Sequence, residues 1–173
     1  MNEDLLKSIE NTAQKKDSAA QQVAAEEVKI TWLIFLINGV KYALPSFNVK
    51  EIIHDMNVYQ IPFVPNYIEG LINVRGEPYT VIEPCVLLEV EKKDTKQGHS
   101  LFIILNIPGD RICLRIEDVL NFYELPESGL RILKHSDNES FIFKGTINFN
   151  GEEIPVIEIN AFEMILKKDL CDD

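Results

Sequence analysis

The chain has 173 residues, of which 46% are hydrophobic, and its 17 basic and 28 acidic residues give a formal net charge of -11. This length suffices for one ordinary hydrophobic core or two small ones. The negative charge works against nucleic acid and anionic membranes as partners, and no apolar run approaches the roughly 18 residues of a membrane-spanning helix.

Residues 1–29 are rich in Ala, Gln, Lys, Glu and Ser and show no sustained apolar periodicity. This composition predicts a flexible or weakly helical extension. The first residues are partly acidic and lack the apolar segment of a signal peptide, so we expect a cytoplasmic protein. The folded part is expected to begin at residue 30.

Residues 31–37 and 40–44 are short β-type runs separated by Asn38-Gly39. This dipeptide between two apolar runs is the strongest short-range signal for a β-hairpin. The folded part is therefore predicted to open with a hairpin.

The segment after Pro45 is predicted to contain one helical turn, because Val49, Ile52 and Ile53 stand at helical spacing. Such a turn could close one end of a barrel. Core packing accounts for at least two of these three aliphatic residues, and Glu51 between them is expected to face solvent at the rim of a contact patch. Residues 57–61 then predict a further short strand that ends before Pro62.

The stretch GLINVRGEPYTVIEP at residues 70–84 recurs later in the chain as GTINFNGEEIPVIEI at residues 145–159. Eight of the fifteen positions are identical. Each copy predicts two strands joined by a two-residue turn, at Arg75-Gly76 and at Asn150-Gly151. The apolar residues that these turns place opposite each other are Ile72 with Tyr79 and Ile147 with Ile154.

Arg75 is unusual for its place in the turn. In a type I′ turn the first central residue has a positive φ, which Asn tolerates and Arg does not favour. Arg75 therefore indicates a different turn, such as a type II turn with Gly76 at its third position, or a contact outside the turn. A guanidinium at a hairpin tip suits a carboxylate on a protein partner, and simple solvation is the alternative.

Residues 99–107 and 111–116 predict two more strands around a turn at 108–110. Aligning Gly39 with Gly109 shows that this part echoes the first hairpin without a gap. The offset of this alignment is slightly smaller than that of the repeated stretch, so one duplication with a small insertion explains both. A repeat of this length suits a small five-stranded barrel.

The apolar spacing in residues 160–168 predicts a short closing helix. Residues 168–173 are assigned to a polar tail. The folded part is thus predicted to end close to residue 167.

Features expected of an enzyme are scarce, since the chain has no GxGxxG, GxxxxGK[ST], HExxH or GxSxG motif. The cysteines lack a CxxC pair and are interpreted as reduced, mostly buried thiols. Four acids recur at equivalent hairpin positions, which indicates a structural role: Glu77, Glu83, Glu152 and Glu158. The histidines are far apart and disfavour a metal site: His54, His99 and His135. No cofactor, metal or catalytic residue is predicted.

The stretch PNYIEGLINVRGEPYTVIE at residues 65–83 resembles the CheW-like adaptor domains of bacterial chemosensory arrays. The shared pattern is a proline, an aromatic residue, a glycine, a hydrophobic-Asn-hydrophobic-Arg-Gly core and an apolar strand that ends in an acid. Similarity continues in VKEI at 49–52, in IEDV at 116–119 and in the second copy, and covers residues 30–167. It implies an all-β fold of two intertwined SH3-like five-stranded barrels with short helices, which agrees with the duplication.

The resemblance also implies a non-enzymatic scaffold that couples chemoreceptors to a histidine autokinase. In this family the arginine of the Asn-x-Arg-Gly motif is important for signalling, and here that arginine is Arg75. The expected partner-binding residues are Gly70, Asn73, Arg75, Gly76, Val49, Glu51 and Ile52. Expected partners are the regulatory domain of the autokinase, the cytoplasmic tips of methyl-accepting chemoreceptors in the groove between the barrels, and other CheW-like domains, with no nucleic acid and no direct membrane insertion.

The alternative from another functional class is a β-barrel protein that binds a small metabolite between its halves. Hydrolytic activity would then use Cys85 or paired glutamates. A panel of metabolites in a thermal-shift experiment separates the two hypotheses, because only a specific ligand raises the melting temperature.

Overall fold

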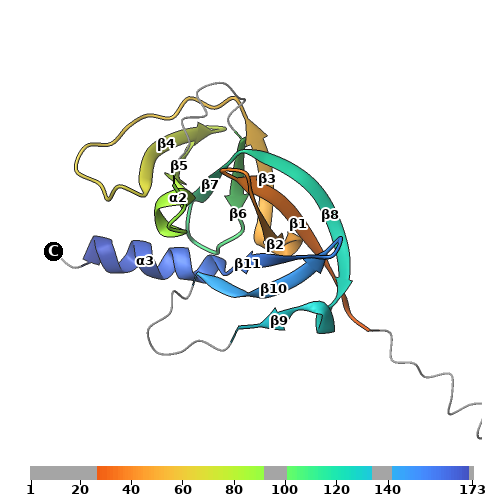
Figure 1. Cartoon of the computed structure of the whole chain (residues 1–173). Coiled ribbons are helices and arrows are strands. Elements are labelled where there is room, and N and C mark those ends of the chain that lie inside the picture. The colour runs from red at the N-terminus through yellow and green to blue at the C-terminus, as the bar shows by residue number, and fades with distance from the viewer. Residues whose placement is uncertain (1–26, 92–100, 134–141, 172–173) are drawn as a thin grey trace, which may run out of the picture.

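The computed structural model describes residues 27–91, 101–133 and 142–171. In these residues strands predominate, and one longer helix lies at the C-terminal end (Figure 1). The elements are β1 (Lys29–Ile37), β2 (Val40–Pro45), the 3₁₀ turn η1 (Ser46–Asn48), β3 (Val49–His54), β4 (Ile68–Val74), β5 (Glu77–Ile82), α2 (Pro84–Leu87), β6 (Leu101–Leu105), β7 (Ile112–Ile116), β8 (Asp118–Pro126), η2 (Glu127–Gly129), β9 (Arg131–Ile132), β10 (Phe143–Phe149), β11 (Glu152–Ile157) and α3 (Ile159–Cys171).

The strands form two sheets, and each sheet takes strands from both copies of the repeat. The six-stranded sheet has the order β8-β1-β2-β11-β10-β9, and the five-stranded sheet has the order β3-β6-β7-β5-β4. The hairpin β1-β2 of the first copy thus adjoins the hairpin β10-β11 of the second, while β6-β7 of the second copy adjoins β4-β5 of the first. This exchange confirms the predicted all-β, two-barrel fold with intertwined halves; the sixth strand of the larger sheet, β9, has only two residues.

The two sheets repeat each other's contacts in the way that the duplicated sequence requires. In one sheet β2 runs parallel to β11, with Ala43 opposite Val156. In the other β7 runs parallel to β5, with Cys113 opposite Val81. Cys113 is the counterpart of Ala43 when Gly39 is aligned with Gly109, and Val156 is the counterpart of Val81 in the repeated stretch. The halves are therefore equivalent in register as well as in sequence.

Three apolar clusters make up the core. One draws on the six-stranded sheet, one on the five-stranded sheet, and the largest combines side chains of both sheets with α3. In β1, Trp32 and Ile34 belong to the first of these clusters, whereas Leu33 and Phe35 belong to the largest. Because β1 is buried on both faces, its sequence is a continuous apolar run and does not alternate.

The predicted hairpins are confirmed with their registers. Ile72 lies opposite Tyr79, and Ile147 lies opposite Ile154. The first hairpin turns at Asn38-Gly39, where both residues have positive φ, as the I′ turn requires.

Several elements differ from the sequence-based expectations, which also lack α2, η2 and β9. The helical turn predicted around Val49–Ile53 is wrong: only Ser46–Asn48 form a 3₁₀ turn, and β3 begins at Val49 because pairing with β6 overrides the local spacing. The strand at 57–61 is reduced to one bridge between Tyr59 and Leu71. Strand β8 has no counterpart among the predicted elements, and α3 continues through 168–171, where the sequence predicts a tail. The predicted extension lies outside the described residues, apart from 27–29.

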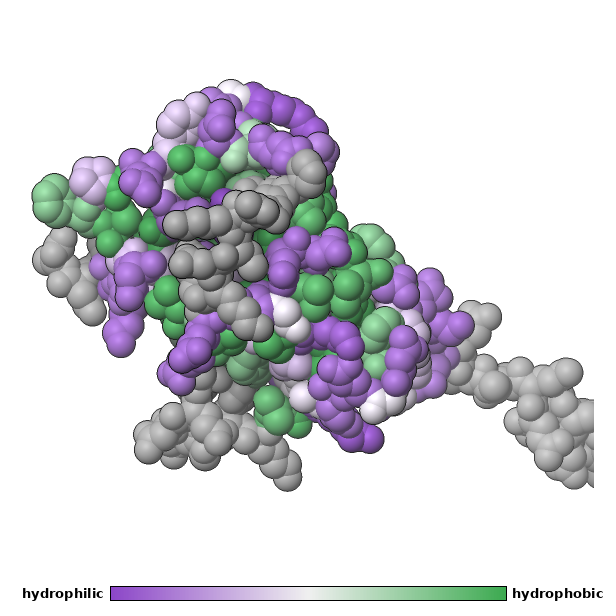
Figure 2. Space-filling view, turned by 45° about the horizontal axis from the view of Figure 1, so that its top comes forward, coloured by the Kyte–Doolittle hydropathy of each residue, from purple (hydrophilic) through white to green (hydrophobic). Residues whose placement is uncertain are grey.

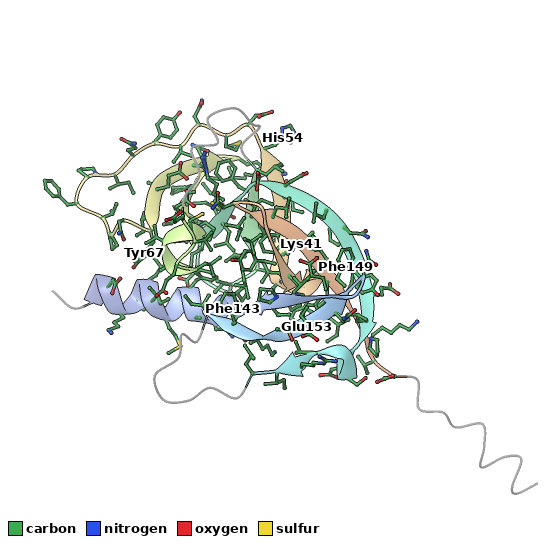
Figure 3. The ribbon with its side chains drawn as sticks, viewed as in Figure 1. Lys41, His54, Tyr67, Phe143, Phe149 and Glu153 are labelled. Carbon is green, nitrogen blue, oxygen red and sulfur yellow. The ribbon has the colours of Figure 1, made fainter. Side chains whose placement is uncertain are left out.

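Helix α3 packs back onto the segment that precedes β4. The hydroxyl of Tyr67, labelled in Figure 3, donates a hydrogen bond of 2.6 Å to the Asp169 carboxylate. Burial, followed by the hydrogen bond and charge of Asp169, raises the pKa of Tyr67 well above its ordinary range. The helix that follows the second copy is thereby attached to the barrel of the five-stranded sheet.

Candidate functional site

The tip of the β4-β5 hairpin is joined to β3 by a two-pronged ion pair. Arg75 Nη2 donates to Glu51 Oε1 at 2.7 Å, and Arg75 Nη1 donates to Glu51 Oε2 at 3.1 Å. The Arg75 side chain is 77% exposed and that of Glu51 is 31% exposed. Strands β3 and β4 are the two outer strands of their sheet, so this pair connects its edges at the surface.

The backbone at Arg75 adopts the conformation that arginine does not favour. Its φ is 53° and that of Gly76 is 90°, compared with 54° and 86° at Asn150 and Gly151. Both turns therefore have positive φ at both central residues, as in type I′, and the type II alternative for Arg75 is wrong. The contact outside the turn that the sequence suggested is found within the same chain, at Glu51.

Stability alone does not explain this arrangement. A left-handed conformation costs a non-glycine residue about 1 kcal/mol or more, whereas an exposed ion pair contributes about 0–1 kcal/mol. The turn would be better served by asparagine, which the second copy has. A backbone conformation of this kind, kept at the surface without a gain in stability, is typical of functional sites.

The equivalent positions of the other barrel have no such pair. Glu51 lies opposite Ile104 in one sheet, and Asn121 lies opposite Ile34 in the other. Since the same alignment that matches Gly39 with Gly109 matches Ile34 with Ile104, Asn121 is the counterpart of Glu51. The counterpart of Arg75 is Asn150. Both charged residues are thus replaced by asparagine together, so the ion pair is specific to one half of a duplicated fold.

The other predicted site residues divide into exposed and buried ones. Asn73 is exposed, and its Oδ1 accepts a hydrogen bond of 2.8 Å from Gly76 N, which holds the tip of the hairpin. Gly70 is buried and packs against the backbone of Tyr59. Val49 and Ile52 are partly buried and pack against the largest cluster, as expected for core residues. The exposed polar surface of the predicted site therefore consists of Glu51, Asn73 and Arg75 with Gly76.

A groove of about 880 Å³ lies between the barrel of the five-stranded sheet and α3, and neither Glu51 nor Arg75 lines it. Lys50 and Glu77 line it, and they are close neighbours in sequence of Glu51 and Arg75. Its apolar lining includes Ile61, Val64, Leu71, Tyr79, Ile112 and Leu166. Nothing in the sequence marked this groove, because its walls come from separate segments of the chain.

The four acids that recur in the repeat all have structural contacts. Glu83 and Glu158 accept hydrogen bonds from backbone amides two residues later, at 3.4 and 3.3 Å, where α2 and α3 begin. Glu77 pairs with Arg111 at 2.8 Å, and Glu152 pairs with Lys41, which is labelled in Figure 3. Each of these two ion pairs joins one copy of the repeat to the other.

The residues considered for hydrolytic activity in the metabolite-binding alternative, Cys85 and the paired glutamates, are buried or engaged in structural contacts. Cys85 is buried in the short helix α2. Within residues 27–91, 101–133 and 142–171, no three or more His, Cys, Asp and Glu side chains are grouped so as to hold a metal ion. In the same residues, no helix has the length and apolar character needed to cross a membrane.

Comparisons with known proteins agree with this architecture. The chemotaxis protein CheW of Helicobacter pylori is 30% identical over 159 residues, which cover 90% of this chain and 93% of that protein. Protein PilI of Pseudomonas aeruginosa is 25% identical over 88 residues, which cover 50% and 49%. The crystal structure of the scaffolding protein TtCheW from Thermoanaerobacter tengcongensis superposes with a TM-score of 0.68 at 24% identity, covering 76% of this chain and 90% of that one.

The family model described as the CheW-like domain matches residues 31–163. This range includes both copies of the repeat, strands of both sheets and the Glu51–Arg75 pair. The chain belongs to the CheW-like domain family.

Proposed function

We propose that this protein is a non-enzymatic adaptor that couples the cytoplasmic tips of chemoreceptors to a histidine autokinase. Membership of the CheW-like family supports the proposal, as does the relative named as a chemotaxis protein in Helicobacter pylori. It would act in the cytoplasm, at receptor arrays in the membrane. A receptor that binds one orientation of the adaptor more tightly than another raises the population of that orientation. The orientation of the adaptor in turn shifts the kinase between its active and inactive states.

The Glu51–Arg75 pair is the observation on which the proposed site rests. The guanidinium keeps donors free for a carboxylate of a partner, because five N–H groups are available and two are used on Glu51. Glu51 fixes its orientation before the partner arrives, which lowers the entropic cost of binding. The apolar lining of the groove between the barrel of the five-stranded sheet and α3 would receive the apolar side of a helical receptor hairpin.

The test is to measure binding of a chemoreceptor tip and of a kinase regulatory domain to the full chain and its variants. Arg75→Ala and Glu51→Ala are expected to weaken at least one of these complexes by about tenfold or more, as for hydrogen-bonded charges at the centre of an interface. Lys41→Ala is the matched control, because it removes the Lys41–Glu152 pair of the other barrel and should leave both affinities unchanged.

Arg75→Asn distinguishes a functional from a structural role of the arginine. It introduces the residue of the second copy, which suits the turn, so the free energy of unfolding should remain within about 1 kcal/mol of wild type. Partner binding should nevertheless fall as in Arg75→Ala. Unchanged binding in folded Arg75→Asn and Arg75→Ala would show that Arg75 is only a solvated turn residue.

A further inference from the structure

Strand β8 presents a long free edge. It has nine residues, forms one end of the six-stranded sheet and, among the described residues, pairs only with β1. Figure 1 shows it as the curved strand on the outer right side of the molecule. The backbone N–H and C=O groups on such an edge can pair with a further strand, and proteins usually protect edges of this length.

The exposed side chains of β8 are two apolar residues with Asn121 between them in its middle, and acidic residues toward its ends. Leu120 is 40% exposed and Phe122 is 54% exposed. Asp118 and Glu124, also exposed, flank them and lie on opposite faces of the strand, because the bulge at Leu120 shifts the alternation. Figure 2 shows hydrophobic residues reaching the surface right of centre, on the side where β8 runs in Figure 1. From residue 116 to residue 130 the chain has four acidic residues and no basic one.

The equivalent edge in the other barrel is protected. Strands β3 and β8 both contain a bulge, at Lys50 in β3 and at its counterpart Leu120 in β8. Lys50 turns back onto the barrel, where its Nζ lies 3.1 Å from the Tyr79 hydroxyl and 5.7 Å from the centre of the ring. A lysine at a bulge is a common device against strand addition. Leu120 at the matching bulge provides no such protection.

We propose that β8 binds an extended segment of a protein partner by strand addition, and that this segment has apolar residues in its middle and basic residues at its ends. Main-chain hydrogen bonds would provide affinity, because the added strand pairs with the backbone N–H and C=O groups on the outer edge of β8. Leu120 and Phe122 would pack against apolar side chains opposite them, and Asp118 and Glu124 would pair with the basic ones. This surface is separate from the Glu51–Arg75 pair and does not depend on the proposed function.

A labelled peptide of sequence Arg-Thr-Ile-Val-Thr-Arg is the probe. Its two arginines are five positions apart and project from opposite faces, as Asp118 and Glu124 do, because the bulge at Leu120 shifts the alternation of β8. Saturable binding to the full chain is expected by fluorescence anisotropy, with new protection of β8 amides in hydrogen exchange. A peptide with Glu in place of Arg should bind at least about tenfold more weakly, because like charges then lie opposite each other.

A version of the probe with N-methylated amides on its pairing edge separates strand addition from attraction of side chains. It keeps every charge and apolar group but lacks the donors, so it is expected to lose binding. Equal binding of the N-methylated peptide would overturn the proposal, as would the absence of saturable binding by the original peptide.

Variants then locate the site. Leu120→Lys and Phe122→Lys should each weaken binding of the probe by about tenfold or more, because each places a cation opposite a basic segment and removes an apolar contact. Met164→Lys makes the same change at a residue of α3 that is 67% exposed and should bind like wild type. Arg75→Ala should also bind like wild type. Wild-type affinity in folded Leu120→Lys and Phe122→Lys would exclude β8 as the site.

Discussion

At the scale of single residues, burial determines which reactive groups are inert. Cys113 is fully buried, and its Sγ–H donates to the carbonyl of Thr80 at 3.4 Å. Burial, and secondarily the charge of Glu69, raises the pKa of Cys113 from 9.0 to about 12. Its counterpart in the other barrel is Ala43, which is equally buried, so the fold accommodates a small side chain without a thiol at the equivalent position.

The raised pKa of Cys113 predicts a loss of stability at alkaline pH. The folded protein keeps the thiol neutral, whereas the unfolded chain ionises it near its ordinary pKa of 9.0. This contribution is therefore fully present below pH 9 and is lost as pH rises from 9 toward 12, by about 1 kcal/mol of unfolding free energy per pH unit. Urea unfolding at a series of pH values measures it.

Cys113→Ala is the comparison for this experiment, because alanine is the residue of the equivalent position. The variant should show a flatter fall of unfolding free energy above pH 9 than wild type. Other groups, including Tyr42, whose pKa burial raises, contribute equally to both proteins and cancel in the difference. Parallel curves for wild type and Cys113→Ala would contradict the assignment.

At the scale of elements, two glycines permit the chain to close over each barrel. A Cβ on Gly70 would lie 2.3 Å from the carbonyl oxygen of Tyr59, and one on Gly145 would lie 2.3 Å from that of Arg131. Gly70 also has a φ of 151°, which L side chains rarely adopt. The segment that contains Tyr59 thus lies directly against β4, and Tyr59 and Leu71 exchange two hydrogen bonds of 2.8 Å.

Gly70→Ala is expected to be strongly destabilising, by about 2 kcal/mol or more, because the clash is with backbone that must shift. Gly109→Ala serves as the control, since it also has a positive φ, of 87°, but no heavy atom within 4 Å of the added Cβ. It should cost only about 1 kcal/mol. Thermal unfolding compares the two, and equal shifts in Tm would show that the close approach at Tyr59 is unimportant.

At the scale of the whole molecule, the exchange of strands makes the two halves depend on each other. Neither repeat forms a complete sheet, since β1 and β2 need β8, β10 and β11, while β4 and β5 need β6 and β7. The largest apolar cluster also contains residues from both halves, such as Phe35 and Phe162. Folding of either half alone would leave unpaired edges and exposed apolar faces.

Separate fragments covering residues 1–92 and 99–173 should therefore be unfolded by circular dichroism and by amide NMR dispersion. Mixed in equal amounts, they are expected to recover the native spectra, because the missing strands are then available in trans. The intact chain should unfold in one cooperative transition. A native-like spectrum from either fragment alone would show that the barrels fold independently.

Much of this organisation is predictable because it depends on local chemistry. The dipeptide Asn38-Gly39 and the recurring stretches at 70–84 and 145–159 define hairpins through turn preferences and apolar runs, and the structure confirms them. The sequence of strand β3 predicts a helical turn, because its short apolar run matches helical spacing by chance. The strand that decides its structure, β6, lies about fifty residues later in the chain. Strand β8 escapes prediction because its exposed apolar residues and its bulge interrupt the alternation expected of a strand.

The sequence alone predicts the duplication, the hairpins, their registers and the family, because each of these depends on adjacent residues or on a repeated stretch. Two further features required the folded molecule: Arg75 adopts the same turn as Asn150, and it pairs with Glu51, which precedes it by 24 residues. The family resemblance implied that the halves are intertwined, and the structure adds which strands each sheet combines. These features depend on which strands become neighbours. That choice is made by burying apolar faces across the whole chain, and no local pattern encodes it.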